Sequence, residues 1–283
     1  RSPSRGLGDV YKRQVLYYMF RYFPRVVLPV LPSAILLGIF YRQTKPLVFV
    51  KDFAEAESTV IADVFGMLFE KNVWYYIILL PVFFVAVSFS CSYLLTMVYK
   101  HFRTGKLSVR MPLSNVNHGL EAVMPSVALI MVMLMAYKAL FGCIVSLITE
   151  VFVGGGAPGI GAAALVAVLG FASYFFVIFF LMYPVVGISL MLVYGYTFTD
   201  AIGESLHIGG KKGFLSLLLG YMFPFVVNAV IAYILMAVSA PQVVVIIVNI
   251  IVQIFVIAYL VLFSIISVFT QQKLERIDLK KLY

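Results

Sequence analysis

The stretch KHFRTGKLSVR, residues 100–110, decides the fold because it places four basic residues between two strongly apolar segments, 73–99 and 120–149. The four are Lys100, Arg103, Lys106 and Arg110. Short loops rich in Lys and Arg stay on the cytoplasmic side of a membrane. We therefore expect the two flanking segments to cross the bilayer in opposite directions. Once loop 100–110 is placed in the cytoplasm, the side of the membrane on which every other loop lies follows from the order of the spans.

The composition is that of a membrane protein. Of the 283 residues, 63% are hydrophobic and only 12% are charged, whereas a soluble domain has about half apolar and about a quarter charged residues. The net charge of +9 is concentrated beside the apolar segments, which predicts contact with a membrane surface and no nucleic-acid partner. Both cysteines, Cys91 and Cys143, lie inside apolar runs and predict no disulfide framework.

Six apolar segments are candidates to cross a hydrocarbon core that requires about 20 residues of helix. We expect spans at about 26–41, 73–99, 122–149, 160–194, 214–238 and 243–270. The first is short and contains Pro29 and Pro32, so a signal peptide is its alternative reading, although no small-residue cleavage site follows it. The predicted fold is all-α, a single polytopic bundle of six transmembrane helices over 15–283. With loop 100–110 inside, both termini are expected in the cytoplasm.

Two stretches outside the spans need separate interpretation. Residues 1–14, RSPSRGLGDVYKRQ, are polar and lack an initiator methionine, and they look like translated sequencing-adaptor read-through. We therefore exclude them from the predicted fold. Residues 42–72 form the longest stretch between spans and are expected outside the cell. Apolar residues recur there at helical spacing, at 60, 61, 64, 65 and 68, which predicts an amphipathic helix at the outer interface.

The segment DAIGESLHIGGKKGFLSLLLGYMFP, residues 200–224, resembles a pattern common in six-helix bacterial integral membrane proteins of unassigned function. These include the membrane domain attached to some glycerophosphodiester phosphodiesterases. In that pattern an inner helix with Ala and Ser positions, here Ala201 and Ser205, leads through a Gly/Lys turn into the next span. The resemblance implies a helical bundle. It transfers no catalytic residue, because the phosphodiesterase chemistry belongs to a separate soluble domain.

Lys138 is the most informative single residue, because it lies within the third predicted span. A lysine there costs about 2.5–3.5 kcal/mol on insertion scales and marks a functional-site hypothesis. Counted from the outer helix ends, Asn228, Asn249 and Gln253 lie at a similar depth, which predicts a polar layer able to bind a substrate. Alternatively, Lys138 extends outward towards Glu150 and the head groups, bonds to the amides structurally, or loses its proton.

Weak metal-ligand candidates follow the fourth span. Asp200, Glu204 and His207 lie at i, i+4 and i+7, so they line one face of a helix. His101 and His118 also lie in or beside inner loops. No pair shows a close spacing such as HxH or HExxH, so solvated surface positions are the preferred reading. We expect no metal and no cofactor, and motifs of serine hydrolases, zinc proteases and nucleotide-binding loops are absent.

Three classes of function remain. We favour a non-enzymatic protein of the bacterial inner (cytoplasmic) membrane that assists envelope assembly, export or maintenance. Its partners would be the lipid bilayer, anionic lipid head groups and a membrane protein or second copy of the chain. The first alternative is a permease for a small anionic solute that binds at Lys138. The second is a membrane enzyme with an inner-face site of His207, Asp200 and Glu204.

Overall fold

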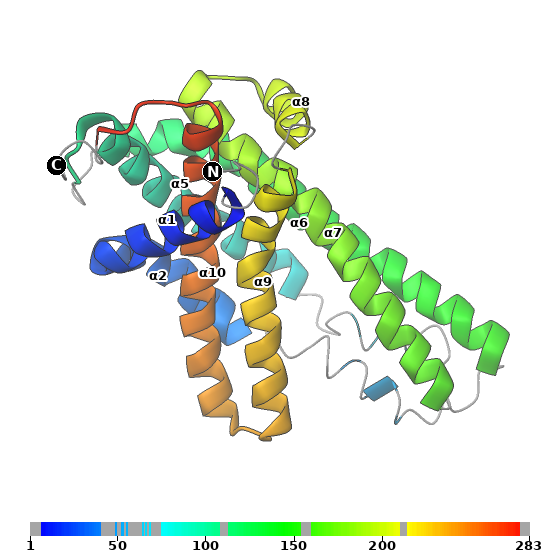
Figure 1. Ribbon diagram of the computed structural model, residues 1–283. Helices are drawn as coiled ribbons and strands as arrows, with labels where there is room; N and C mark the ends of the chain where they lie inside the picture. Colours follow the sequence, from blue (N-terminus) through cyan, green and yellow to red (C-terminus); the bar gives the residue numbers. More distant parts are fainter. Residues whose placement is uncertain are drawn as a thin grey trace.

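The computed structural model describes residues 7–40, 75–107, 113–153, 160–209 and 214–277, together with Phe49, Asp52, Phe53, Glu55, Val64, Gly66 and Leu68. All regular structure in these residues is helical (Figure 1). The helices are α1 (Leu7–Arg21), α2 (Phe23–Phe40), the π-helix η1 (Tyr75–Leu79), α5 (Leu80–Thr104), α6 (Leu113–Val153), α7 (Ile160–Tyr194), α8 (Phe198–Gly209), α9 (Phe214–Ala237) and α10 (Gln242–Gln271).

Six of these helices are long and apolar enough to cross a membrane, which confirms the predicted all-α class and the number of spans. Helix α6 begins at Leu113, nine residues before the predicted 122, and α5 also extends beyond its predicted end at 99. Helix α5 continues to Thr104 and ends at Gly105, whose φ of 66° and N–H bond to the His101 carbonyl, 2.8 Å, form a left-handed C-cap. Lys100 and Arg103 therefore lie on the last turns of a helix, and Arg110 lies outside the described residues.

Helix α1 begins at Leu7, inside the segment that we excluded as read-through. From residue 12 on, where the side chains of α1 are described, the buried hydrophobic residues are Val15, Tyr18 and Met19, which all follow residue 14. The helix packs across α10 and α9 (Figure 1). Gln14 accepts a hydrogen bond of 3.4 Å from Arg276 in the tail. These three residues, which follow the excluded segment, thus form the buried apolar face among the described side chains of α1.

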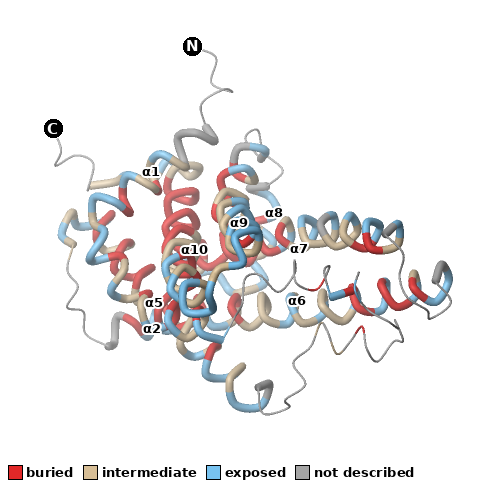
Figure 2. The backbone as a smooth tube through the Cα atoms, turned by 90° about the horizontal axis from the view of Figure 1, so that it is seen from below, coloured by how far each residue is buried: buried red, intermediate tan, exposed pale blue. Residues whose placement is uncertain are grey.

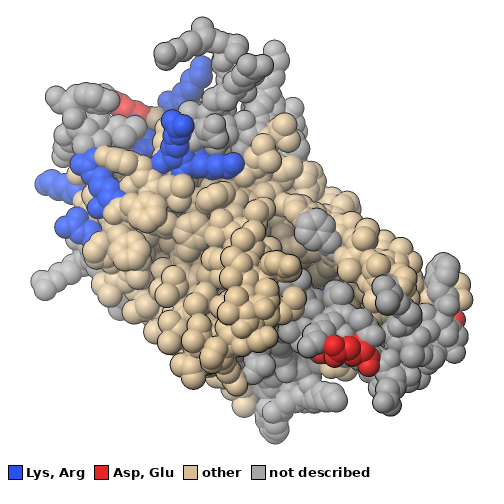
Figure 3. All heavy atoms as spheres, turned by 60° about the horizontal axis from the view of Figure 1, so that its bottom comes forward, with Lys and Arg blue, Asp and Glu red and all other residues tan. Residues whose placement is uncertain are grey.

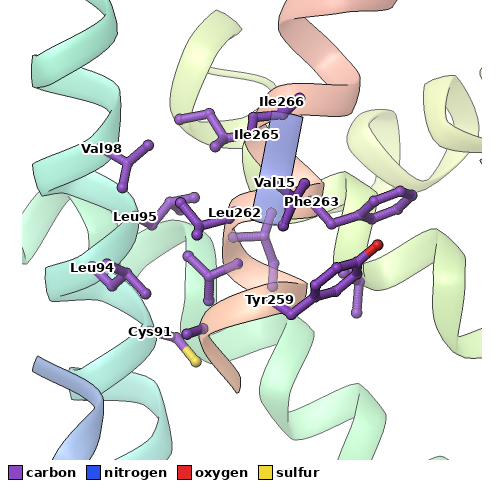
Figure 4. Packing of buried hydrophobic residues seen from close by; sticks show 14 of the residues in the cluster. Val15, Cys91, Leu94, Leu95, Val98, Tyr259, Leu262, Phe263, Ile265 and Ile266 are labelled. Atoms are coloured by element: carbon purple, nitrogen blue, oxygen red, sulfur yellow. The ribbon is translucent and has the colours of Figure 1, made fainter. Parts of the chain in front are cut away.

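The core is built around α10, which contacts α1, α2, α5, α7 and α9. Between Ile257 and Phe269 it is buried on nearly all sides, as the red stretch in Figure 2 shows. Figure 4 shows Leu95 and Val98 of α5 facing Leu262 of α10. A helix that is apolar all round and buried all round occupies the centre of a bundle. The second half of α10 is therefore the axis on which the other helices pack.

A second, smaller cluster joins α6 to α7. Phe141 and Val145 of α6 pack with Ala163 and Val166 of α7. Phe49, Phe53 and Val64, from the stretch between α2 and η1, pack against the same cluster. Figures 1 and 2 show the paired α6 and α7 running away from α9 and α10. Most of the amphipathic helix predicted within 42–72 lies outside the described residues.

Basic side chains gather at one end of the bundle. Figure 3 shows most of the Lys and Arg atoms at that end, with an acidic group among them, and a patch of acidic atoms at the opposite end. Two of these basic residues lie over neighbouring aromatic rings: Arg103 lies over the Phe269 ring, 5.7 Å from its centroid, and Arg276 lies over the Phe102 ring, at 4.0 Å. The centroids of these two rings are 5.3 Å apart. We call this part of the molecule, where α1, the end of α5 and the tail after α10 meet, the basic end.

Candidate functional site

The residues of the predicted polar layer lie on three helices and make different contacts. Lys138 is half-buried on α6 and is adjacent to Tyr137, which packs on the second cluster. Asn249 is buried on α10, where its Nδ2 donates a 3.0 Å hydrogen bond to the Gly38 carbonyl of α2. Helix α6 packs mainly on α5 and α7, whereas α10 packs on α2 and α9. Asn249 therefore fastens two helices together.

The other two amides of the predicted layer lie on α9 and α10. Gln253 is buried on α10, one turn after Asn249. Asn228 is half-buried on α9, and its buried Oδ1 has no hydrogen-bond partner within the part of the chain that the structure describes. A buried amide oxygen without a partner is costly. Asn228 thus keeps its place among the candidate binding residues.

Lys138 has no ion-pair or hydrogen-bond partner among the described residues. Its neighbour Tyr137 donates to the Gly170 carbonyl of α7, at 3.3 Å. Glu150 lies on the same helix, about 18 Å away at helical rise, and is exposed. An unpaired lysine within a span is a functional-site hypothesis on its own.

The weak metal-ligand candidates lie on α8. Asp200 and His207 are exposed, and Glu204 is half-exposed. Asp200 accepts a 2.5 Å hydrogen bond from Thr197, and the Thr197 hydroxyl accepts a bond from the Asp200 N–H, an arrangement that caps the start of the helix. Among the described residues no group of three His, Cys, Asp or Glu side chains is placed to hold a metal ion. Asp200 thus contributes to the capping of α8.

The remaining histidines have contrasting surroundings. His101 is buried at the basic end, where its Nδ1 lies 2.8 Å from the hydroxyl of Tyr18 and the Tyr22 ring stands edge-on at 5.0 Å. His118 is exposed on α6 and lies 3.7 Å from the carboxylate of Glu121. Sequence reasoning did not find the His101 contact, because Tyr18 is 83 residues away and had no pattern linking it to α5. The contact joins α1 to α5.

A pocket of about 460 Å³ lies beside the basic end, between α5, α6 and the turn from α7 to α8. It combines polar and apolar groups from three helices: Thr96, Tyr99, Lys100, His118, Glu121, Ala122, Met191, Leu192, Gly195 and Tyr196. Lys100 was predicted to set topology, and no motif connected it to the other lining residues. Because it combines charged, hydroxyl and apolar groups in one concave site, this pocket is a candidate binding site.

Comparison with protein-family models, with curated proteins and with solved structures gave no match. No family is assigned. Inferences about function therefore rest on the geometry of this chain.

Proposed function

We propose that this chain is a non-enzymatic integral membrane protein of the bacterial cytoplasmic membrane that assists envelope assembly, export or maintenance through helix and lipid contacts. The gathering of Lys and Arg at one end of six apolar helices carries the proposal (Figure 3). Positive charge favours the cytoplasmic side. The basic end is then cytoplasmic, with both chain ends at that face.

Aromatic and basic groups at the basic end support contact with anionic head groups. The Arg103 guanidinium lies over the Tyr99 ring, 5.7 Å from its centroid, and Arg21 lies 5.6 Å from that of Tyr22. Arginine on an aromatic face holds its charge at the membrane boundary while its stem and the ring remain in apolar surroundings. Residues 200–224 carry the resemblance to six-helix bacterial membrane proteins, and in α8 Ala201 and Ser205 are buried. Membership of that group stays a proposal.

Site-directed labelling tests the orientation. With Cys91 and Cys143 replaced by Ala, single cysteines are introduced at Lys106, beside the basic end, and at Gln242, the first residue of α10. A membrane-impermeant maleimide added to intact cells is expected to label only the cysteine at 242. The cysteine at 106 should react after the membrane is permeabilised. Labelling of 106 in intact cells would reject the proposed orientation.

A permease for a small anionic solute is the second candidate, favoured by the unpaired, half-buried Lys138. Under the main proposal, Lys138→Ala should restore the envelope integrity of cells lacking the protein as well as wild type does. Uptake and efflux of anionic solutes should then be equal for both proteins at matched expression. Detergent sensitivity and solute flux are measured in the same strains. A flux carried by wild type and lost in Lys138→Ala would replace the main proposal with the permease.

A further inference from the structure

We propose that the pocket between α5, α6 and the α7–α8 turn binds a phosphate ester, supplied by the head group of an anionic phospholipid. The inference rests on the proposed function only for the side of the membrane on which the pocket opens. Its volume of about 460 Å³ falls within the roughly 300–1,000 Å³ typical of small-molecule sites. The pocket is therefore large enough for a glycerophosphate head group.

Lys100 is the cationic group of the pocket lining. The ammonium group of Lys100 has no ion-pair or hydrogen-bond partner among the described residues, and this lysine is half-buried. The carboxylate of Glu121 is directed to His118, 3.7 Å away, and both side chains are largely exposed, at 69% and 84%. Lys100 is thus the cation of the pocket that is available to a ligand, and the opposing charge of Glu121 is weakened because its carboxylate is exposed to solvent. A lysine ammonium is a common phosphate ligand in proteins.

Two tyrosines belong to the pocket lining. Tyr99 and Tyr196 both line it, and each phenol can donate a hydrogen bond to a phosphate oxygen. Arg103 lies over the Tyr99 ring, so a second positive charge stands close to the pocket. Gly195, with a φ of 69°, makes the turn that ends α7, and this turn stacks Tyr196 on Tyr194 with ring centroids 5.4 Å apart. The positive-φ turn therefore fixes one wall of the site.

The apolar wall and the location favour a lipid as the source of the phosphate. Ala122, Met191 and Leu192 line the same pocket, and these give a phospholipid's glycerol and upper acyl carbons a surface that a free phosphate ester would leave empty. The pocket lies near the end of α5, where the span gives way to the basic residues. Helix α8, which packs on α7 beside it, exposes Leu206 and His207 on one surface. An amphipathic helix of this kind suits the head-group region.

Calorimetric titration of the purified full chain in maltoside micelles tests the proposal. The probes are dihexanoyl phosphatidylglycerol, dihexanoyl phosphatidylcholine and glycerol 1-phosphate. Phosphatidylglycerol is expected to bind at least tenfold more tightly than the zwitterionic lipid, and Lys100→Gln should weaken it about tenfold, as for a charged hydrogen bond. Lys106→Gln is the matched control, because it removes the same charge close to the basic end without altering the pocket lining. It should leave the affinity unchanged.

If Lys100→Gln fails to fold, the variant Glu121→Gln provides a second test of the binding site. Removing this exposed acidic group should tighten phosphatidylglycerol binding about twofold, as expected for a partly screened charge. If Lys100→Gln and Lys106→Gln weakened phosphatidylglycerol binding equally, or if the protein bound the two lipids with equal affinity, the proposed binding site in this pocket would be rejected. Binding of glycerol 1-phosphate as tight as that of phosphatidylglycerol would overturn the lipid source. Micelles have no inside or outside, so a reversed orientation in cells would reject the proposed function without affecting this result.

Discussion

Gly38→Ala is expected to separate α2 from α10 and to lower the melting temperature of the purified protein. A Cβ atom at Gly38 would lie 2.8 Å from the Cα and 2.9 Å from the backbone nitrogen of Ile250. Backbone atoms cannot rotate away as a side chain can, so a helix must move. Such overpacking costs about 1–3 kcal/mol, and the movement also strains the Asn249 hydrogen bond to the Gly38 carbonyl, 3.0 Å. Thermal unfolding followed by circular dichroism measures the loss.

Gly161→Ala is the matched control for this prediction. A Cβ at Gly161, on α7, has no heavy atom within 4 Å among the neighbours considered. Alanine favours helix over glycine by about 1 kcal/mol, so this variant should be as stable as wild type or more stable. If both variants melt at the wild-type temperature, the close approach of α2 and α10 at Gly38 is wrong.

Phe102→Ala is expected to loosen both ends of the chain at once. The Phe102 ring is fully buried and stands edge-on to Tyr18 of α1, at 5.5 Å, and to Phe269 of α10, at 5.3 Å. The guanidinium group of Arg276 lies 4.0 Å from the ring centroid. Removing a buried Phe side chain costs about 3–5 kcal/mol. Limited proteolysis should therefore cut within α1 and after Phe269 much faster than in wild type.

Phe89→Ala is the control for this prediction, because it removes an aromatic ring from the same helix without removing the buried contacts of Phe102. Phe89 lies on the same helix, α5, but is 44% exposed on the surface. Its removal should change the cleavage rates little, because a surface ring in a micelle exchanges one apolar contact for another. Equal rates of terminal cleavage in the two variants would show that Phe102 does not hold the chain ends.

The spans were predictable because hydrophobicity alone sets them. The predicted limits of α7, 160–194, are those observed, and both α9 and α10 differ from prediction by single residues at their ends. The end of α5 was not predicted, since hydropathy falls at Lys100 while the helix persists until Gly105 provides a left-handed cap. Apolar content marks where a helix enters the membrane, and capping marks where it stops.

The candidate site was less predictable, because depth in the membrane does not determine which helices are neighbours. Lys138 and Asn249 were matched by counting residues from helix ends, but α6 runs with α7 away from α10 (Figure 1). The pocket is the opposite case. Lys100, Glu121 and Tyr196 have no common spacing in the sequence, and only the packing of α5, α6 and α7 brings them together. Long-range contacts of this kind leave no periodic signal.

The central position of α10 has a consequence for biogenesis. Of the described helices, α10 is the last to be synthesised, yet α1, α2, α5, α7 and α9 all pack on it. The earlier helices therefore enter the bilayer without the surface on which they finally assemble. During translation their small and polar contact positions, such as Gly38 and Ser189, face lipid or an insertion factor until α10 arrives and Ser264 pairs with Ser189. The packing of these five helices on α10 is accordingly completed only after α10 has been inserted.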